Sequence, residues 1–222
     1  MNKDFAKFYR SLSSTTDTKL LDYSKQLNYI SPNIIDNDMN SGAVVDIFSR
    51  LLKDRIIVLG TEINDVVANI INSQILYLQM LDSAKDITMY INSGGGSVYG
   101  GLSILDTMDL VDNDIMTINT GLAASMSAVI LSNGTKGKRF ALRRSQTMIH
   151  QPIGYIGQAQ AIDINIEAKH INNLKNELYE TLSANTGKSI SEISNDSDRD
   201  HWLSASETVK YGIIDEVITK KK

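Results

Sequence analysis

The feature that most constrains the fold is an alternation of apolar runs and amphipathic segments between residues 55 and 131. Uninterrupted apolar runs of this length are typical of strands buried on both faces. Strands that alternate with helices form parallel sheets with right-handed crossovers, so the sequence predicts an α/β fold. The expected strands are 55–60, 86–92 and 114–120, and the expected helices are 64–81, 98–111 and 123–131.

The pattern becomes less regular after residue 138. Two short strands are expected at 139–142 and 146–150. Near the C-terminus, Ser204 and Glu207 form a capping box, and Gly212 is suited to end the helix that they begin. A last strand is expected at 213–218.

Two segments stand apart from this sheet. Residues 1–42 are polar and rich in Asn, Ser and Asp, which predicts an N-terminal arm, a candidate propeptide or axial loop, ahead of a domain over 43–222. Residues 158–186 predict a strand followed by a helix. The strand is predicted because three isoleucines alternate with polar residues, at Ile162, Ile164 and Ile166.

Composition excludes several classes of protein. The chain has no cysteine, so it has no disulfide framework, no thiolate metal site and no cysteine nucleophile, and a reducing cytoplasm suits it. The net charge of −4 argues against a nucleic-acid partner. No apolar run approaches the roughly 18 residues that span a bilayer, and the N-terminus lacks the apolar core of a secretory signal.

Histidine is scarce, with three in the chain. His150 ends a predicted strand, and in α/β sheets strand ends are where sites are built, so it is a candidate base or a core histidine. His170 lies in a helical segment among polar residues, as a solvated histidine would. His201 stands between an acid and Trp202, an arrangement that suits a base or an ordinary surface equally.

Ser125 follows a predicted strand and lies in the first turn of an apolar helix. Backbone N–H groups at a helix N-terminus can stabilise an oxyanion, although small residues here also permit close helix packing. The segment 94–97 joins a strand to a helix without the Lys-Ser/Thr of a phosphate-binding loop. It is better suited to pair with an extended peptide.

Three acids, Asp196, Asp198 and Asp200, alternate in one short segment. The segment lacks the Gly and the bidentate Glu of an EF-hand loop, and the H-E-x-x-H zinc motif is absent from the chain. An acid that orients a histidine and a solvated acidic turn both remain open.

Together these segments resemble the Clp protease family of serine peptidases. The motifs that carry the resemblance occur in the family's order at 49–57, 90–98, 123–126, 148–152 and 196–205. The resemblance implies a catalytic triad of Ser125, His150 and Asp200. It also implies an oxyanion hole made by the backbone N–H groups of Gly96 and Met126, with no metal and no organic cofactor.

The resemblance further implies a crotonase-like spiral of ββα units, with 158–186 as a protruding strand-helix handle. Two seven-membered rings would stack into a tetradecamer whose chamber receives unfolded polypeptides from an AAA+ Clp unfoldase. Asp198 and Arg199 would link the ring contact to the triad. The unfoldase pocket would comprise Tyr90, Leu110, Ile118, Phe140 and Leu142, which ordinary core packing explains equally well.

Two positions depart from the family's pattern. Gly94 stands where proline is usual, and Ser127 stands where glycine or alanine is usual. These departures leave open a catalytically silent ring subunit. A crotonase-like acyl-CoA enzyme, which would share the fold and the oxyanion hole, is the second alternative at this point.

Overall fold

The computed structural model describes residues 32–36, 43–154 and 157–219 of the chain. The chain divides into two compact units, 1–54 and 55–222. In the first unit, strands β1 (Asn33–Asp36) and β2 (Ala43–Asp46) pair antiparallel, and helix α3 (Ile47–Lys53) follows. The predicted arm over 1–42 lies for the most part outside the described residues and stays a prediction.

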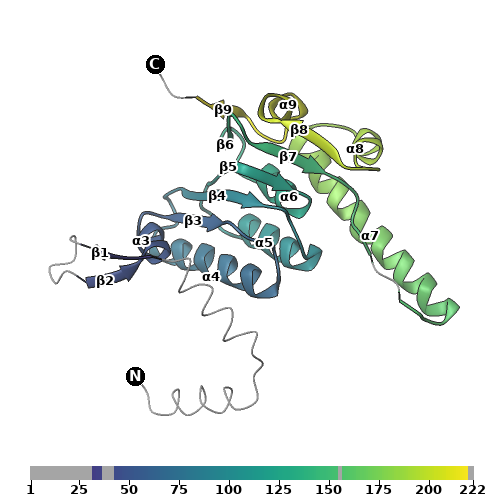
Figure 1. Cartoon of the computed structure of the whole chain (residues 1–222), viewed down its shortest axis with the longest axis horizontal. Helices are drawn as coiled ribbons and strands as arrows, with labels where there is room; N and C mark the ends of the chain where they lie inside the picture. The colour runs from purple at the N-terminus through teal and green to yellow at the C-terminus, as the bar shows by residue number, and fades with distance from the viewer. Residues whose placement is uncertain (1–31, 37–42, 155–156, 220–222) are drawn as a thin grey trace, which may run out of the picture. The chain divides into compact units, whose positions relative to one another are not determined.

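The second unit is built on a seven-stranded sheet whose order is β3-β4-β5-β6-β9, with β7 beside β5 and β8 beside β7 (Figure 1). All pairings are parallel except that of β7 with β8, which confirms the predicted α/β fold. The strands are β3 (Ile56–Leu59), β4 (Ile87–Ser93), β5 (Ile115–Ala124), β6 (Arg139–Leu142), β7 (Gln146–Ile149), β8 (His201–Ser204) and β9 (Glu216–Ile218).

Strand β5 is long enough to pair with two different strands along the same edge. Its first half pairs with β6 through Ile118 and Phe140, and its last three residues pair with β7 through Ala124 and Met148. The expected strand at 114–120 is therefore too short, and the following helix begins at Met126 rather than at residue 123. The difference arises because Leu122, Ala123 and Ala124 pair with β7, a long-range contact that the local pattern does not contain.

Three helices lie side by side against the sheet: α4 (Asp65–Leu81), α5 (Val98–Leu110) and α6 (Met126–Ser132) (Figure 1). Asn64 caps α4 by accepting a hydrogen bond from the amide of Val67, as its position in the sequence predicts. The core between these helices and the sheet is formed by large apolar side chains that are at most 1% exposed, including Ile57, Ile75, Leu78, Met89, Ile104 and Ile130.

The segment expected to be a strand-helix handle is one helix, α7 (Ala161–Thr186), which extends away from the sheet (Figure 1). The predicted strand is wrong. No described strand lies beside residues 162–166 to form a ladder with them, whereas a helix forms its backbone hydrogen bonds within the segment. Ile162 and Ile166 are 71% and 62% exposed, so their alternation does not mark a buried face.

Two further helices complete the unit, α8 (Ile190–Asp196) and α9 (Ala205–Tyr211). The predicted capping box of Ser204 and Glu207 is present, and Gly212 ends α9 with a left-handed φ of 92°. Strand β8 and helix α8 were not expected from the sequence. Among the described residues, no helix is long and apolar enough to cross a membrane.

Candidate active site

Three of the predicted site residues lie at one edge of the sheet because of how the strands end. Ser125 directly follows β5, and His150 directly follows β7, its parallel neighbour. The carboxyl ends of parallel strands meet at the same edge. Strand β8 runs antiparallel to β7 and pairs His201 with Ile149, so Asp200, just before β8, reaches the same place.

The backbone of Ser125 is held in a conformation that non-glycine residues rarely adopt, with φ 56° and ψ −128°. Its amide donates to the carbonyl oxygen of Met148 at 2.8 Å, and its carbonyl oxygen accepts from the amide of Ala128 at 2.9 Å. These bonds hold the sharp turn from strand to helix. Such turns present a nucleophile at the top of a sheet and cost about 1–3 kcal/mol in backbone strain.

His150 lies between the other two residues. Its Nε2 is 2.8 Å from the Oγ of Ser125, and its Nδ1 is 3.3 Å from the Oδ1 of Asp200. The His150 side chain is 15% exposed, whereas that of Asp200 is 58% exposed. With the ring proton on Nδ1, the serine hydroxyl donates to Nε2, which is the arrangement that a general base requires.

The glycine strip, defined here as Gly95 and Gly96, passes close to the turn at Ser125. A Cβ added to Gly95 would lie 2.6 Å from the carbonyl oxygen of Ala124, 2.8 Å from the Cβ of Ser125 and 2.9 Å from the amide of Met126. Gly95 also has a φ of 91°. Only glycine fits this approach without displacing backbone.

Ile63 holds the other side of the strip. Its amide donates to the carbonyl oxygen of Gly95, and its own carbonyl oxygen accepts from the amide of Ser97, both at 2.8 Å. Within one trans peptide group the C=O and the N–H point to opposite sides. The N–H and C=O of Gly96 therefore face away from Ile63. Met126 is the first residue of α6, so its amide has no partner within the helix.

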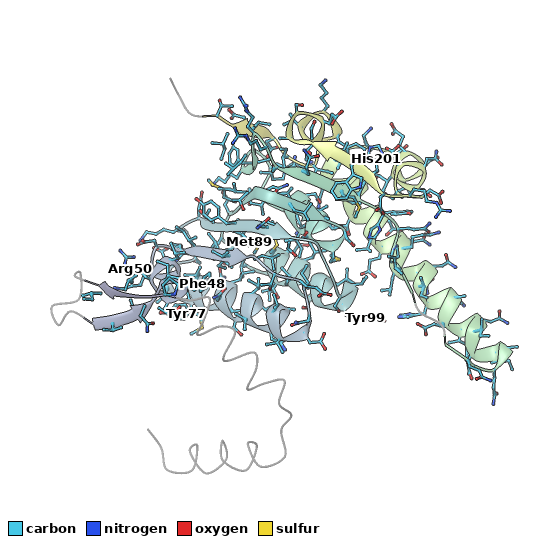
Figure 2. The ribbon with its side chains drawn as sticks, in the orientation of Figure 1. Phe48, Arg50, Tyr77, Met89, Tyr99 and His201 are labelled. Carbon is cyan, nitrogen blue, oxygen red and sulfur yellow. The ribbon has the colours of Figure 1, made fainter. Side chains whose placement is uncertain are left out.

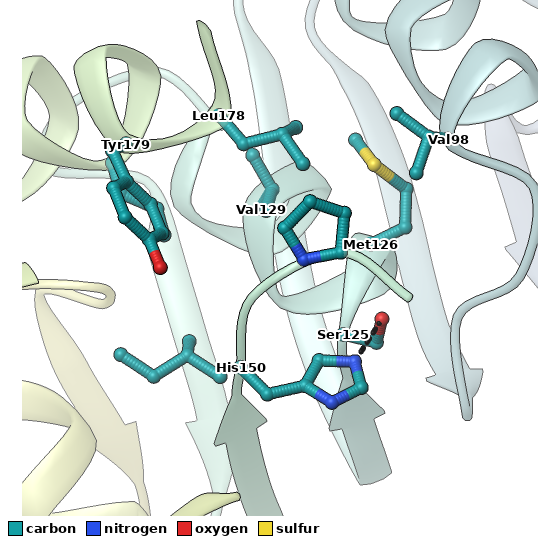
Figure 3. A pocket seen from close by; sticks show the side chains of 10 residues that line it. Val98, Ser125, Met126, Val129, His150, Leu178 and Tyr179 are labelled. Atoms are coloured by element: carbon teal, nitrogen blue, oxygen red, sulfur yellow. Dashed lines mark hydrogen bonds between the residues drawn. The ribbon is translucent and has the colours of Figure 1, made fainter. Parts of the chain in front are cut away.

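An apolar pocket opens beside Ser125 and His150 (Figure 3). Helix α7 contributes its C-terminal half to one wall of the pocket, and α5 and α6 contribute to another. The other lining residues are Val98, Met126, Val129, Ile149, Pro152, Leu178, Tyr179 and Leu182. The pocket is suited to an uncharged, apolar group.

Tyr179 is the polar exception in this wall and is 3% exposed. Burial raises its pKa, and the negative charge of Asp198 raises it further, while a hydrogen bond with Ser194 acts in the opposite direction. A raised pKa keeps the phenol protonated at neutral pH. The pocket therefore carries no charge on its lining side chains apart from any that His150 acquires.

Asp198 and Arg199 are both exposed and lie directly before Asp200. Gln151, the residue after His150, donates from its Nε2 to the carbonyl oxygen of Asp198 at 3.1 Å, and its amide donates to the carbonyl oxygen of Ser197 at 2.7 Å. The segments that follow His150 and precede Asp200 are thus tied to each other. Sequence patterns gave no sign of this link.

Three of the five predicted docking residues lie in one row across the sheet, because Tyr90 pairs with Ile118 and Ile118 pairs with Phe140. Leu142 lies two residues further along β6, on the same face, and is 38% exposed, while Leu110 ends α5 and is 73% exposed. Ile118 is 5% exposed and is the one core-like member of the set. Their role stays a prediction.

The other two histidines contact residues other than Ser125. His201 begins β8 and its ring is tilted against Tyr211. His170 is exposed on α7, as expected, but its Nε2 is hydrogen-bonded to the hydroxyl of Tyr99, which lies at the start of α5 on the side facing α7 (Figure 2). Among the described residues, no group of three His, Cys, Asp or Glu side chains is placed to hold a metal ion.

The contribution of α7 to the pocket wall was not predicted, although the sequence contains the apolar spacing that marks the buried face of this helix. Leu178 and Leu182 are four residues apart and belong to the helical pattern of that segment. That spacing identifies a buried face. It does not say which part of the molecule the face covers, because the packing of α7 on α6 is a long-range contact.

Comparison with known proteins identifies relatives over almost the whole chain. The family model described as Clp protease matches residues 39–221. A curated ATP-dependent Clp protease proteolytic subunit from Porphyromonas gingivalis is 48% identical over 220 residues, which cover 99% of both chains. The proteins of that name from Bacteroides fragilis and Bacteroides thetaiotaomicron are 50% and 47% identical, over 88% and 98% of this chain and 94% and 99% of theirs.

Proposed function

The chain belongs to the Clp protease family and is a serine peptidase, a proteolytic subunit of an ATP-dependent Clp protease. From that premise we propose that Ser125 is its nucleophile, His150 its general base and Asp200 the acid that orients the imidazole. The observation that carries this proposal is the 2.8 Å approach of His150 Nε2 to Ser125 Oγ. Family membership sets aside the alternative of an acyl-CoA enzyme.

In the proposed reaction, Ser125 Oγ attacks the carbonyl carbon of a peptide bond while His150 Nε2 takes the hydroxyl proton. Asp200 stabilises the imidazolium that forms. His150 then gives the proton to the leaving amine, which departs and leaves an acyl-enzyme. Water, deprotonated by the same imidazole, attacks the ester, and the peptide acid is released with Ser125 restored.

The oxyanion of each tetrahedral intermediate would be stabilised by the backbone N–H groups of Gly96 and Met126. The outward direction of the Gly96 peptide groups and the free amide position at the start of α6 support this role. The same strip offers an edge on which an extended substrate pairs. The apolar pocket would hold the side chain on the acyl side of the cleaved bond.

The assembly is also a proposal. We infer two stacked heptameric rings, a tetradecamer in the cytoplasm, that receives unfolded polypeptides from an AAA+ Clp unfoldase. Helix α7 extends from the sheet with most of its surface exposed, which suits a contact between rings. Asp198 and Arg199 are exposed next to Asp200, so a subunit contact there would act directly on the triad. The row of Tyr90, Ile118 and Phe140 supports an unfoldase pocket.

The test is labelling with a fluorophosphonate probe, which reacts with activated serines, followed by mapping of the modified residue by mass spectrometry. We expect one label, at Ser125, that disappears in Ser125→Ala and falls strongly in His150→Ala. Ser132→Ala is the matched control, since it removes a buried hydroxyl from α6, the helix that Ser125 precedes.

Labelling at a different residue would refute the assignment of the nucleophile. Failure to label an assembled tetradecamer would favour the remaining alternative, a silent ring subunit.

A further inference from the structure

Ser127, two residues after Ser125, is fully buried in the first turn of α6. Its Oγ lies 2.6 Å from the carbonyl oxygen of Ser93 and 2.8 Å from that of Ala124, and it accepts a hydrogen bond from the amide of Ala124 at 2.9 Å. One hydroxyl thus joins the last residue of β4 to the last residue of β5.

This link lies where the pairing of the two strands is irregular. Ile91 pairs with Asn119 and Ser93 pairs with Ala123, so two steps along β4 correspond to four along β5. At such a bulge the regular ladder of hydrogen bonds is locally disrupted. The side chain of Ser127 supplies a cross-strand connection at the position where the backbone ladder is weakest.

The connection continues into the glycine strip. The Oγ of Ser93 accepts a hydrogen bond from the amide of Gly95 at 3.1 Å, and Ser93 is itself buried. A chain of hydrogen bonds therefore runs from Gly95 through Ser93 and Ser127 to Ala124, the residue before Ser125. It fixes the strip that carries one oxyanion donor relative to the turn that carries the nucleophile.

We propose that Ser127 is a positioning residue that sets the separation between the glycine strip and Ser125. The inference rests on the proposed function, in which Ser125 is the nucleophile and Gly96 donates to the oxyanion. Each hydrogen bond described above for the Ser127 hydroxyl is with a backbone atom, so Ser127 acts through the two strand ends rather than on the substrate. Glycine or alanine at this position would leave the buried Ser93 carbonyl and Ala124 amide without this partner.

The test compares Ser127→Ala with Ser132→Ala in the assembled protein. Ser132 is a matched control, because it is 1% exposed on the same helix and its Oγ is bonded to Val129 and Asn185, away from the strip. The readouts are kcat and KM for a fluorogenic peptide, and the inhibition constant of a peptide boronate, whose tetrahedral adduct occupies the oxyanion position.

For Ser127→Ala we expect kcat to fall about tenfold and boronate binding to weaken by a similar factor, with KM within about twofold, because only the tetrahedral state needs the donor in register. Ser132→Ala should change kcat, KM and the boronate inhibition constant by less than about twofold. Its melting temperature should fall about as far as that of Ser127→Ala, because both variants lose a buried hydrogen bond. Ser127→Gly, which also lacks the hydroxyl, should repeat the loss of kcat and replaces Ser127→Ala if that variant does not fold.

The proposal is overturned if both Ser127 variants fold and keep wild-type kcat and boronate affinity, or if Ser132→Ala loses as much activity. Labelling of the wild-type protein separates this failure from that of the proposed function. If the fluorophosphonate marks Ser125 and the Ser127 variants behave as wild type, only the role of Ser127 fails. If the wild-type protein is not labelled at Ser125, the proposed function fails as well.

Discussion

Replacing Gly95 with alanine should disable catalysis while the adjacent substitution, Gly94→Ala, should not. The new Cβ at residue 95 would lie 2.6 Å from the carbonyl oxygen of Ala124, where an ordinary contact begins at 3.4 Å. The strip must therefore move by roughly 0.8 Å, because the three atoms that the new Cβ would approach, in Ala124, Ser125 and Met126, lie in or next to the backbone and cannot rotate away. A displacement of about 1 Å at a reacting centre costs on the order of a hundredfold in rate.

The two substitutions are closely matched in chemistry and differ in their surroundings. A Cβ at Gly94 would meet nothing within 4 Å, and Gly94 has no positive φ, whereas the φ of Gly95 is 91°. Gly95→Ala should lose about 1–3 kcal/mol of stability through backbone strain. Gly94→Ala should gain about 0.4–1 kcal/mol, because alanine has fewer conformations to lose from the unfolded chain.

The assay is kcat/KM for a fluorogenic peptide, with native mass and melting temperature measured on the same samples. We expect Gly95→Ala to assemble, to melt a few degrees lower and to lose about a hundredfold in kcat. Gly94→Ala should assemble, melt slightly higher and keep kcat within about threefold. The reasoning is refuted if Gly95→Ala keeps kcat within fivefold of wild type, or if Gly94→Ala falls as far.

Three further outcomes follow from the described contacts. Asp200→Asn should lower kcat by about a thousandfold or more with KM little changed, measured by steady-state peptide hydrolysis, because the imidazolium loses its counter-charge. Val98→Phe should narrow the apolar pocket and shift the preferred acyl-side residue towards smaller apolar side chains, measured with a matched peptide series. Burial raises the pKa of Asp215, but hydrogen bonds and charge from Arg139 outweigh this and lower it overall. The stability that ionised Asp215 contributes is therefore full above the unfolded pKa of about 3.9 and is lost as the pH falls through the lower folded pKa. Asp215→Asn should lower the free energy of unfolding by about 3 kcal/mol at pH 7, measured by denaturant titration, and should abolish this loss of stability at acid pH.

Local signals predicted the parts of the fold that local interactions determine. The cap at Asn64 and the capping box at Ser204 depend on bonds within four residues, and both are present where the sequence puts them. His150 likewise lies at the end of the short strand expected at 146–150. Ser125, in contrast, was expected inside a helix that begins at residue 123, whereas it directly follows the longer strand β5.

Features that depend on distant pairings were missed or mistaken. The position of Asp200 beside His150 depends on the antiparallel pairing of β7 with β8, a strand that no pattern marked. The isoleucines from Ile162 onward alternate with polar residues as in a strand. No described strand lies beside them, and the segment forms a helix instead. The contact of Gly95 with the nucleophile turn depends on a bulge between β4 and β5, which leaves no mark in either strand alone.

The left-handed backbone at Ser125 means that the best residue for folding and the best residue for chemistry differ at this position. Glycine would relieve the strain, so a chain selected only for stability would give up the proposed nucleophile there. Two inactive versions of the enzyme are therefore not equivalent. Ser125→Ala removes the hydroxyl and keeps the backbone strain of the turn. Ser125→Gly removes both and should have the higher free energy of unfolding of the two variants.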